Sequence, residues 1–344
     1  MLDSVRNNLV SPLTLSFGLG VLAKVIRSEL AFPKELYTSL SIYLLFALGL
    51  RGGVELSETH LHAIARPAMV TLLLGALTPV SAFFVLRRIG RFGVPDAAGI
   101  AAHYGSVSAV TFIAAQQFVA AAGQPAEGYT ATLLTLLESP GIHVALALGA
   151  VGAAHATSLA RSAPATGVIA LGDSPAPLVE GGPSVMASLR EIVTARTMVL
   201  LMGGLAIGYV TGAHGYEPVR PFFDSGFKGA LTLFLLEMGL TAGARLQDLR
   251  KVGLFLVAFG VLMPIAHGAL GVLLGHFAGM SPGGCTVLGA MAASASYIAA
   301  PSAVRTNLPD ANPTYSLTAA LVITFPFNLL IGIPLYFELA RRIA

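Results

Sequence analysis

Apolar runs long enough to form membrane-spanning helices follow one another from end to end of this chain, and they restrict its fold more than any other feature. The chain is 55% hydrophobic and only 11% charged, whereas soluble domains hold roughly 25% charged residues. We therefore expect an all-α polytopic membrane protein with ten transmembrane helices. The predicted spans are residues 12–29, 37–50, 61–86, 97–121, 128–156, 197–212, 225–241, 251–278, 282–307 and 312–340.

The ten predicted spans fall into two halves joined by a segment without membrane character. Residues 157–196 are rich in Gly, Pro, Ser and Ala and predict a cytoplasmic linker between a first five-helix unit, 1–156, and a second, 197–344. The loops after the odd-numbered spans hold 13 of the 20 lysines and arginines. The positive-inside rule therefore predicts an inner (cytoplasmic) membrane protein with both termini on the non-cytoplasmic side.

Four short segments of the first half recur in the second half, in the same order and 185 to 190 residues further on. The pairs are ALGLRGG (47–53) with EMGLTAG (237–243), LTPVSA (77–82) with LMPIAH (262–267), HYGSVSAVT (103–111) with MAASASYIA (291–299), and YTATLLTLLESP (129–140) with YSLTAALVITFP (315–326). Because each half holds an odd number of spans, the second half must be inserted upside down. We therefore expect two inverted five-helix repeats, which are typical of secondary transporters with a substrate site near the midplane.

The third pair of segments combines small and polar residues inside apolar surroundings and predicts two broken helices at the midplane. Ser106 aligns with Ser294, and Ser108 aligns with Ser296. A broken helix leaves backbone groups unpaired in hydrocarbon unless a ligand, an ion or a cavity satisfies them. Helix N-termini at the breaks suit an anion, and free carbonyl and hydroxyl oxygens suit Na⁺. The competing interpretation of any single serine is helix packing by a small residue, without a ligand.

Two ionisable residues within apolar runs add candidates of another kind. Glu138 lies two residues before Pro140, where a carboxylate can ligate Na⁺ or take a proton, unless it reaches water at the interface. Glu237 is also intramembrane, but pairing with Lys228 or another neighbouring base explains it equally well. His103 is predicted to be a hydrogen-bonded structural residue.

From these segments onward the chain resembles the sodium-dependent bicarbonate transporter family, which includes the permeases of the cyanobacterial carbon-concentrating system. The resemblance runs from SPLTLSFGLGVLAKVI (11–26) to IGIPLYFELA (331–340) and is strongest in PDAAGIAAHYGSVSAVT (95–111) and AASASYIAAPSAVRTNLPDANPTYS (292–316). It implies ten spans, a core domain that moves against a gate domain, a homotrimer, and Na⁺-coupled uptake of a small anion. It also implies that a small PII-like regulatory protein binds the cytoplasmic face of some members.

The repeated serines and the resemblance together predict the residues of the site. The predicted substrate-binding residues are Gly105, Ser106, Ser108, Ser294, Ser296 and Tyr297, and the predicted sodium-binding residues are Ser108, Thr111, Glu138, Ser296 and Thr324. Glu138 stands where the relatives carry an intramembrane aspartate. Tyr297, in contrast, stands where they carry an aspartate in the second broken helix. Its hydroxyl can donate to a bound anion, or its ring can fill the space of the missing carboxylate.

These features favour a secondary active transporter that couples Na⁺ to the uptake of bicarbonate or a related small anion by alternating access. The alternatives are an H⁺- or Na⁺-coupled permease for another small anion such as a carboxylate, a receptor-like binding protein, or a passive channel. A channel needs a continuous polar pore, whereas the polar residues here are local. The sequence has no HExxH motif and no convincing Ser/His/Asp arrangement. We therefore expect no enzyme, no metal site other than sodium, and no nucleic-acid partner.

Overall fold

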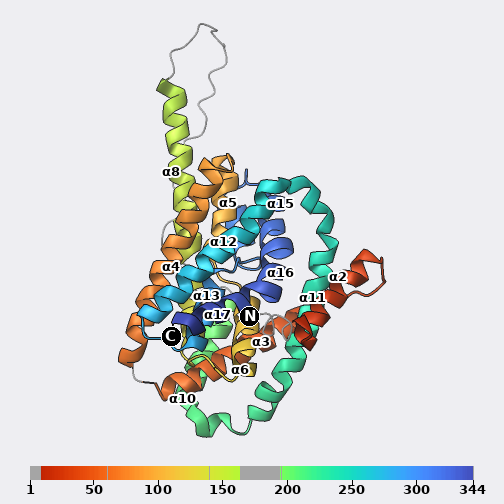
Figure 1. The fold of residues 1–344 in the computed structure, drawn as a ribbon, viewed down its shortest axis with the longest axis vertical. Coiled ribbons are helices and arrows are strands. Elements are labelled where there is room, and N and C mark those ends of the chain that lie inside the picture. The colour runs from red at the N-terminus through yellow and green to blue at the C-terminus, as the bar shows by residue number, and fades with distance from the viewer. Residues whose placement is uncertain (1–8, 60, 139, 163–193, 195, 344) are drawn as a thin grey trace.

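The computed structural model describes residues 9–59, 61–138, 140–162, 194 and 196–343, and within them every regular element is a helix (Figure 1). Eight of these helices are long and apolar enough to cross a membrane. They cover Lys34–Ser57, His62–Arg88, Val94–Ala121, Thr130–Gly152, Met198–Tyr216, Pro221–Ala244, Leu246–Phe277 and Pro313–Ile343. The chain is thus an all-helical, multi-pass membrane protein, as its apolar runs predict.

The helices of the first half extend to Ser162, six residues into the predicted linker (157–196), most of which (163–193) lies outside the described residues. They are α2 (Pro12–Val25), α3 (Lys34–Ser57), α4 (Leu61–Arg88), α5 (Val94–Gly105), α6 (Ala109–Ala121), α7 (Thr130–Glu138) and α8 (Pro140–Ser162). The second half contains α10 (Arg196–Tyr216), η1 (Pro221–Ser225), α11 (Gly226–Ala244), η2 (Leu246–Asp248), α12 (Leu249–Phe277), α13 (Pro282–Ala292), α14 (Ala300–Asn307), α15 (Pro313–Leu317), η3 (Thr318–Thr324), α16 (Phe325–Phe327), η4 (Asn328–Gly332) and α17 (Ile333–Ile343).

Two of the ten predicted spans have no counterpart among the eight long helices. The first corresponds to α2, which has only 14 residues and begins after Ser11, whose side chain accepts a hydrogen bond from the Thr14 N–H. The ninth is divided into α13 and α14 by the irregular segment 293–299. The second predicted span, 37–50, was too short, because α3 has 24 residues and therefore spans roughly 36 Å.

The helices sort into two groups by their packing. In the first, α2 packs along α11 and α3 packs along α10, while α3 also contacts α11; we call α2, α3, α10 and α11 the four-helix group. The other helices, α4–α8 and α12–α17, form what we call the broken-helix unit. In this unit α5 packs on α4 and α8, and α13 packs on α6, α12 and α17. Figure 1 shows α2 beside α11 at the edge of the molecule and α8 projecting beyond the other helices.

Glycines allow the helix pairs of the four-helix group to approach closely. A Cβ atom on Gly49 would lie 2.5 Å from the carbonyl oxygen of Leu201 in α10, and one on Gly239 would overlap a carbonyl oxygen of α2. Gly49 packs against Gly204, and Gly239 packs against Gly20. The two glycines that the repeated segments align therefore have the same role, one in each helix pair.

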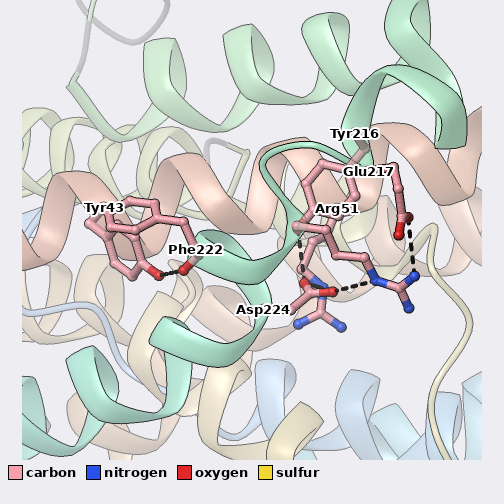
Figure 2. Close-up of polar contacts among 7 residues, drawn as sticks. Tyr43, Arg51, Tyr216, Glu217, Phe222 and Asp224 are labelled. Atoms are coloured by element: carbon pink, nitrogen blue, oxygen red, sulfur yellow. Dashed lines mark hydrogen bonds and ion pairs between the residues drawn. The ribbon is translucent and has the colours of Figure 1, made fainter.

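A polar network fastens the connection between α10 and α11 to α3 (Figure 2). The Asp224 carboxylate accepts a hydrogen bond from the Tyr216 hydroxyl at 2.9 Å and lies 3.4 Å from Nε of Arg51 in α3. The Tyr43 hydroxyl, also in α3, donates to the carbonyl oxygen of Phe222 at 2.5 Å. Because these groups are partly exposed, each ion pair adds little stability, and their main effect is to fix the course of the chain here.

Candidate functional site

The two predicted helix breaks are present, one in each half of the broken-helix unit. The first half-helix, α5, ends at Gly105, and Ser106 and Ser108 have extended backbone conformations before α6 begins. In the second half, α13 ends at Ala292, and segment 293–299 leads to α14. Each break thus leaves a helix C-terminus and a helix N-terminus facing the interior of the protein.

A serine caps the helix that follows each break. The Ser108 side chain accepts a hydrogen bond from the Thr111 N–H at 3.3 Å and so caps α6. The Ser296 side chain accepts hydrogen bonds from the N–H groups of Ala299 and Ala300, at 3.2 and 3.4 Å, where α14 begins. The two serines that the sequence aligns therefore perform the same local task, and they leave two helix N-termini, with their partial positive charge, near one place.

The two breaks also hold each other. The Ser108 N–H donates to the Ser294 hydroxyl at 2.8 Å. The Ser296 N–H is shared between the carbonyl oxygens of His103, at 2.8 Å, and Ser106, at 3.1 Å. All four serines are at most 4% exposed. The structure therefore brings the predicted serines together, and part of their purpose is to satisfy backbone groups that a broken helix leaves unpaired.

A small cavity lies between these breaks and the four-helix group. Its volume is about 30 Å³, enough for one or two water-sized ligands. Its wall consists of Ser41, Leu44, Leu45, Val107, Ser108, Ala109, Val110, Ile113, Glu138, Phe234, Ser296, Tyr297, Ile298 and Ala299. We call it the central cavity, because residues from both halves of the chain and from both helix groups meet there.

Two polar atoms at the central cavity have no hydrogen-bond partner although they are buried. They are Oε2 of Glu138 and the hydroxyl oxygen of Tyr297, which faces Ser108 without a hydrogen bond of normal geometry. Leaving a buried polar group unpaired costs free energy, so these atoms mark where a ligand would be stabilised. The side-chain oxygens of Glu138, Ser108 and Ser296 are ligands of the kind that coordinate Na⁺ at broken helices. These residues therefore fit the ion.

Five predicted site residues do not line the central cavity: Gly105, Ser106, Thr111, Ser294 and Thr324. Ser106 and Ser294 make the contacts between the two breaks. Gly105 packs against Pro79 and Gly141 with no space for a side chain. Thr111 is buried and contributes its N–H to the cap of α6. The hydroxyl of Thr324 lies 2.6 Å from the Tyr104 hydroxyl and donates to the carbonyl oxygen of Gly260 at 2.7 Å. Any part that these residues have in binding stays a prediction.

Asn328 supports the second break and is absent from the predicted site. Its side chain is fully buried, donates to the carbonyl oxygen of Ala293 at 2.9 Å and accepts from the Tyr336 hydroxyl at 3.0 Å. It thus satisfies a carbonyl that the end of α13 leaves free. The signal in the sequence is an amide within an apolar run, two residues after Pro326.

Two carboxylates hold the connecting segments against the starts of other helices. Oε1 of Glu127, between α6 and α7, accepts a hydrogen bond from the N–H of Ser281 at 2.5 Å, just before α13. Oδ1 of Asp96, in the first turn of α5, accepts one from the N–H of Asn312 at 2.8 Å, just before α15. A carboxylate at a helix N-terminus is favourable, so both contacts position the outer ends of the broken helices.

The model of the Na⁺-dependent bicarbonate transporter superfamily matches residues 12–341, which is nearly the whole chain. No individually curated protein matches the chain.

Proposed function

The chain belongs to the Na⁺-dependent bicarbonate transporter superfamily, and on that premise we propose that it couples Na⁺ to the uptake of bicarbonate or a related small anion by alternating access. The superfamily is one of transporters and not of enzymes, and its name states both the Na⁺ dependence and the substrate.

The observation that carries the proposal is the crossing of the two helix breaks beside the central cavity. Ala109 and Val110, the first residues of α6, and Ala299, just before α14, lie on its wall. An anion at this place is stabilised by the partial positive charge of both helix N-termini. Glu138 supplies a carboxylate oxygen that has no partner and suits the coupling ion. An anion and a cation bound side by side would stabilise each other, and the cavity of about 30 Å³ must widen to hold both.

Alternating access follows from the position of the central cavity between two helix groups. Ser41 and Phe234 of the four-helix group face the breaks across it. A shift of the broken-helix unit against the four-helix group would expose the cavity first to one side of the membrane and then to the other. Inverted repeats would supply two such states of similar energy. The matching contacts of Gly49 and Gly239 support this arrangement.

The test is uptake of labelled bicarbonate by proteoliposomes that hold the purified protein, with an inward Na⁺ gradient or with K⁺ in place of Na⁺. We expect uptake only with Na⁺. Glu138→Gln and Ser108→Ala should each lower uptake by about ten- to a hundredfold, since a lost bond to an ionised group costs roughly 1.5–3 kcal/mol. Glu58→Gln, at an exposed carboxylate, and Ser302→Ala, at an exposed serine, are the matched controls. Absence of Na⁺-stimulated uptake for bicarbonate and for other small anions would reject the proposal.

A second candidate is coupling to H⁺, and the unpaired Oε2 of Glu138 is the observation that favours it. A buried carboxyl group without a basic partner can bind a proton in place of Na⁺. Uptake driven by an inward pH gradient without Na⁺, abolished by Glu138→Gln, would establish this alternative. A small carboxylate such as acetate would then be tested as substrate beside bicarbonate.

The distribution of lysines and arginines extends the proposal to topology, and the resemblance extends it to assembly. We propose that both termini lie outside the cytoplasm, that three copies assemble, and that a small regulatory protein binds the cytoplasmic face. Native mass spectrometry of the protein in detergent gives the number of copies. Labelling of terminal tags in intact cells gives the orientation.

A further inference from the structure

A second cavity lies on the other side of Tyr297 from the central cavity. Its volume is about 240 Å³, several times that of the central cavity. Its wall consists of Tyr37, Glu237, Met238, Thr241, Arg245, Tyr297, Leu317 and Leu321. Among the described residues that line the two cavities, Tyr297 alone belongs to both.

The second cavity lies toward one end of the four-helix group. Tyr37 is in the first turn of α3, and Arg245 is the residue after the last turn of α11. Lys24 lies in the last turn of α2 and Lys34 is the first residue of α3. Both lysines belong to the set that the positive-inside rule assigns to the cytoplasm. This cavity therefore lies between the midplane site and the membrane face that is richer in bases.

The Tyr297 side chain lines both cavities. Its hydroxyl oxygen is buried. Its ring packs edge-on against Phe325, with 5.8 Å between the ring centroids. The residue belongs to the irregular segment 293–299, so no helical hydrogen bonds fix its backbone. A large ring on a non-helical segment can swing aside without unwinding a helix.

We propose that the 240 Å³ cavity is the vestibule through which a small anion passes between the central cavity and one face of the membrane, and that the Tyr297 side chain is the gate that closes it. The chemistry of the wall suits such an ion. Arg245 supplies positive charge, and Tyr37 and Thr241 supply hydroxyl groups. The Glu237 carboxylate accepts a hydrogen bond from the Thr241 hydroxyl at 3.3 Å. Its negative charge weakens the binding of the anion in the vestibule, so that the anion can leave. The identity of the ion rests on the proposed function; the gate does not.

The gate and a simple ligand role make different demands on Tyr297. A gate works through the volume of the ring, so Tyr297→Phe leaves the passage closed and Tyr297→Ala opens it. A ligand works through the hydroxyl, so both substitutions have the same effect. A reporter of access to the central cavity therefore separates the two roles.

The experiment uses a reporter cysteine at Val107, which lines the central cavity and is not a proposed ligand, in a Cys285→Ala background that removes the native thiol. The rate at which a small methanethiosulfonate reagent modifies Val107→Cys is measured on the purified full-length protein. We expect Tyr297→Ala to raise this rate about tenfold or more, because the open passage becomes the dominant state. With Tyr297→Phe, the modification rate should stay within about twofold of the rate in the protein that keeps Tyr297. Tyr297→Trp should lower the modification rate.

A second reporter, Leu317→Cys on the vestibule wall, controls for folding and for reagent access. Its rate should be the same with alanine, phenylalanine or tyrosine at position 297. Equal Val107→Cys rates in all gate variants, or equal acceleration by Tyr297→Ala and Tyr297→Phe, would overturn the proposal. Because modification does not require transport, a protein without Na⁺-driven uptake but with a ring-dependent rate would reject the proposed function and keep the gate.

Discussion

The hydrogen bond between the two helix breaks gives the sharpest test of how the site is built. The Ser294 hydroxyl accepts from the Ser108 N–H at 2.8 Å and donates to the carbonyl oxygen of Met291 at 2.8 Å. Ser294→Ala removes the acceptor and leaves the Ser108 N–H without this partner, in a place where the serine is only 1% exposed. The change is small in volume, so its effect is almost wholly that of the lost bond.

The expected loss follows from the cost of a buried donor without an acceptor, which is about 1–3 kcal/mol. We expect Ser294→Ala to lower the free energy of unfolding by about 2 kcal/mol. Ser302→Ala is the matched control. The Ser302 hydroxyl also donates to a carbonyl three residues earlier, that of Ala299 at 3.0 Å, but the side chain is exposed and accepts nothing from the first break. Its substitution should change the free energy by less than about 0.5 kcal/mol.

Both free energies can be measured by unfolding the protein in mixed micelles with increasing sodium dodecyl sulfate. Circular dichroism is the suitable signal, because the chain contains no tryptophan. Uptake by proteoliposomes should fall with Ser294→Ala and stay unchanged with Ser302→Ala. If the two variants unfold within about 0.5 kcal/mol of each other, the breaks are not held together by this bond, and the reasoning about the crossing is refuted.

Three further predictions concern contacts away from the crossing. Gly239→Ala should destabilise the protein by about 1–3 kcal/mol, because the new methyl group overlaps a carbonyl oxygen of α2. The control is Gly229→Ala, whose methyl group meets no atom within 4 Å. This control should leave the melting temperature in detergent unchanged or higher. Glu127→Gln should speed hydrogen exchange in the first turn of α13, because the bond to the Ser281 N–H loses its charge; an unchanged rate would refute this. Asp224→Asn should lower the melting temperature slightly at low salt and not at high salt, because the ion pairs that it breaks are partly exposed.

The long helices were predictable from the sequence, but some of their boundaries were not. A helix that spans a membrane requires an apolar run of matching length, so the run predicts the helix. Accordingly, α4, α10 and α12 lie close to their predicted ranges. The predicted second span ends at residue 50, directly before Arg51, whereas α3 does not end there. In the structure Arg51 lies beside Asp224, and the helix continues to Ser57. Pairing between segments far apart in sequence decides this, and the sequence alone does not show it.

The crossing of the two helix breaks was predictable because the same pair of serines occurs in both halves of the sequence. One serine in an apolar run indicates little, whereas two pairs at the same spacing predict one shared role, and Ser108 and Ser296 both cap the helix after a break. The directions of the neighbouring side chains were not predictable. Thr324 turns to Tyr104 instead of the central cavity. Likewise, the position of Tyr297 between two cavities depends on where α3 and α11 pack.

The aligned segments carry different side chains at equivalent positions, so the two halves contribute different groups to the site. Glu138 and Thr324 occupy equivalent positions of the repeated sequence, yet Glu138 reaches the central cavity with an unpaired oxygen, and the Thr324 hydroxyl is held by a carbonyl and a tyrosine. The first half thus offers the free carboxylate that suits a cation. The second half offers Tyr297, which closes the cavity toward the vestibule. A symmetric site would offer the same groups toward both faces of the membrane. The difference between Glu138 in one half and Tyr297 in the other gives the transporter a physical basis for a preferred direction of entry and release.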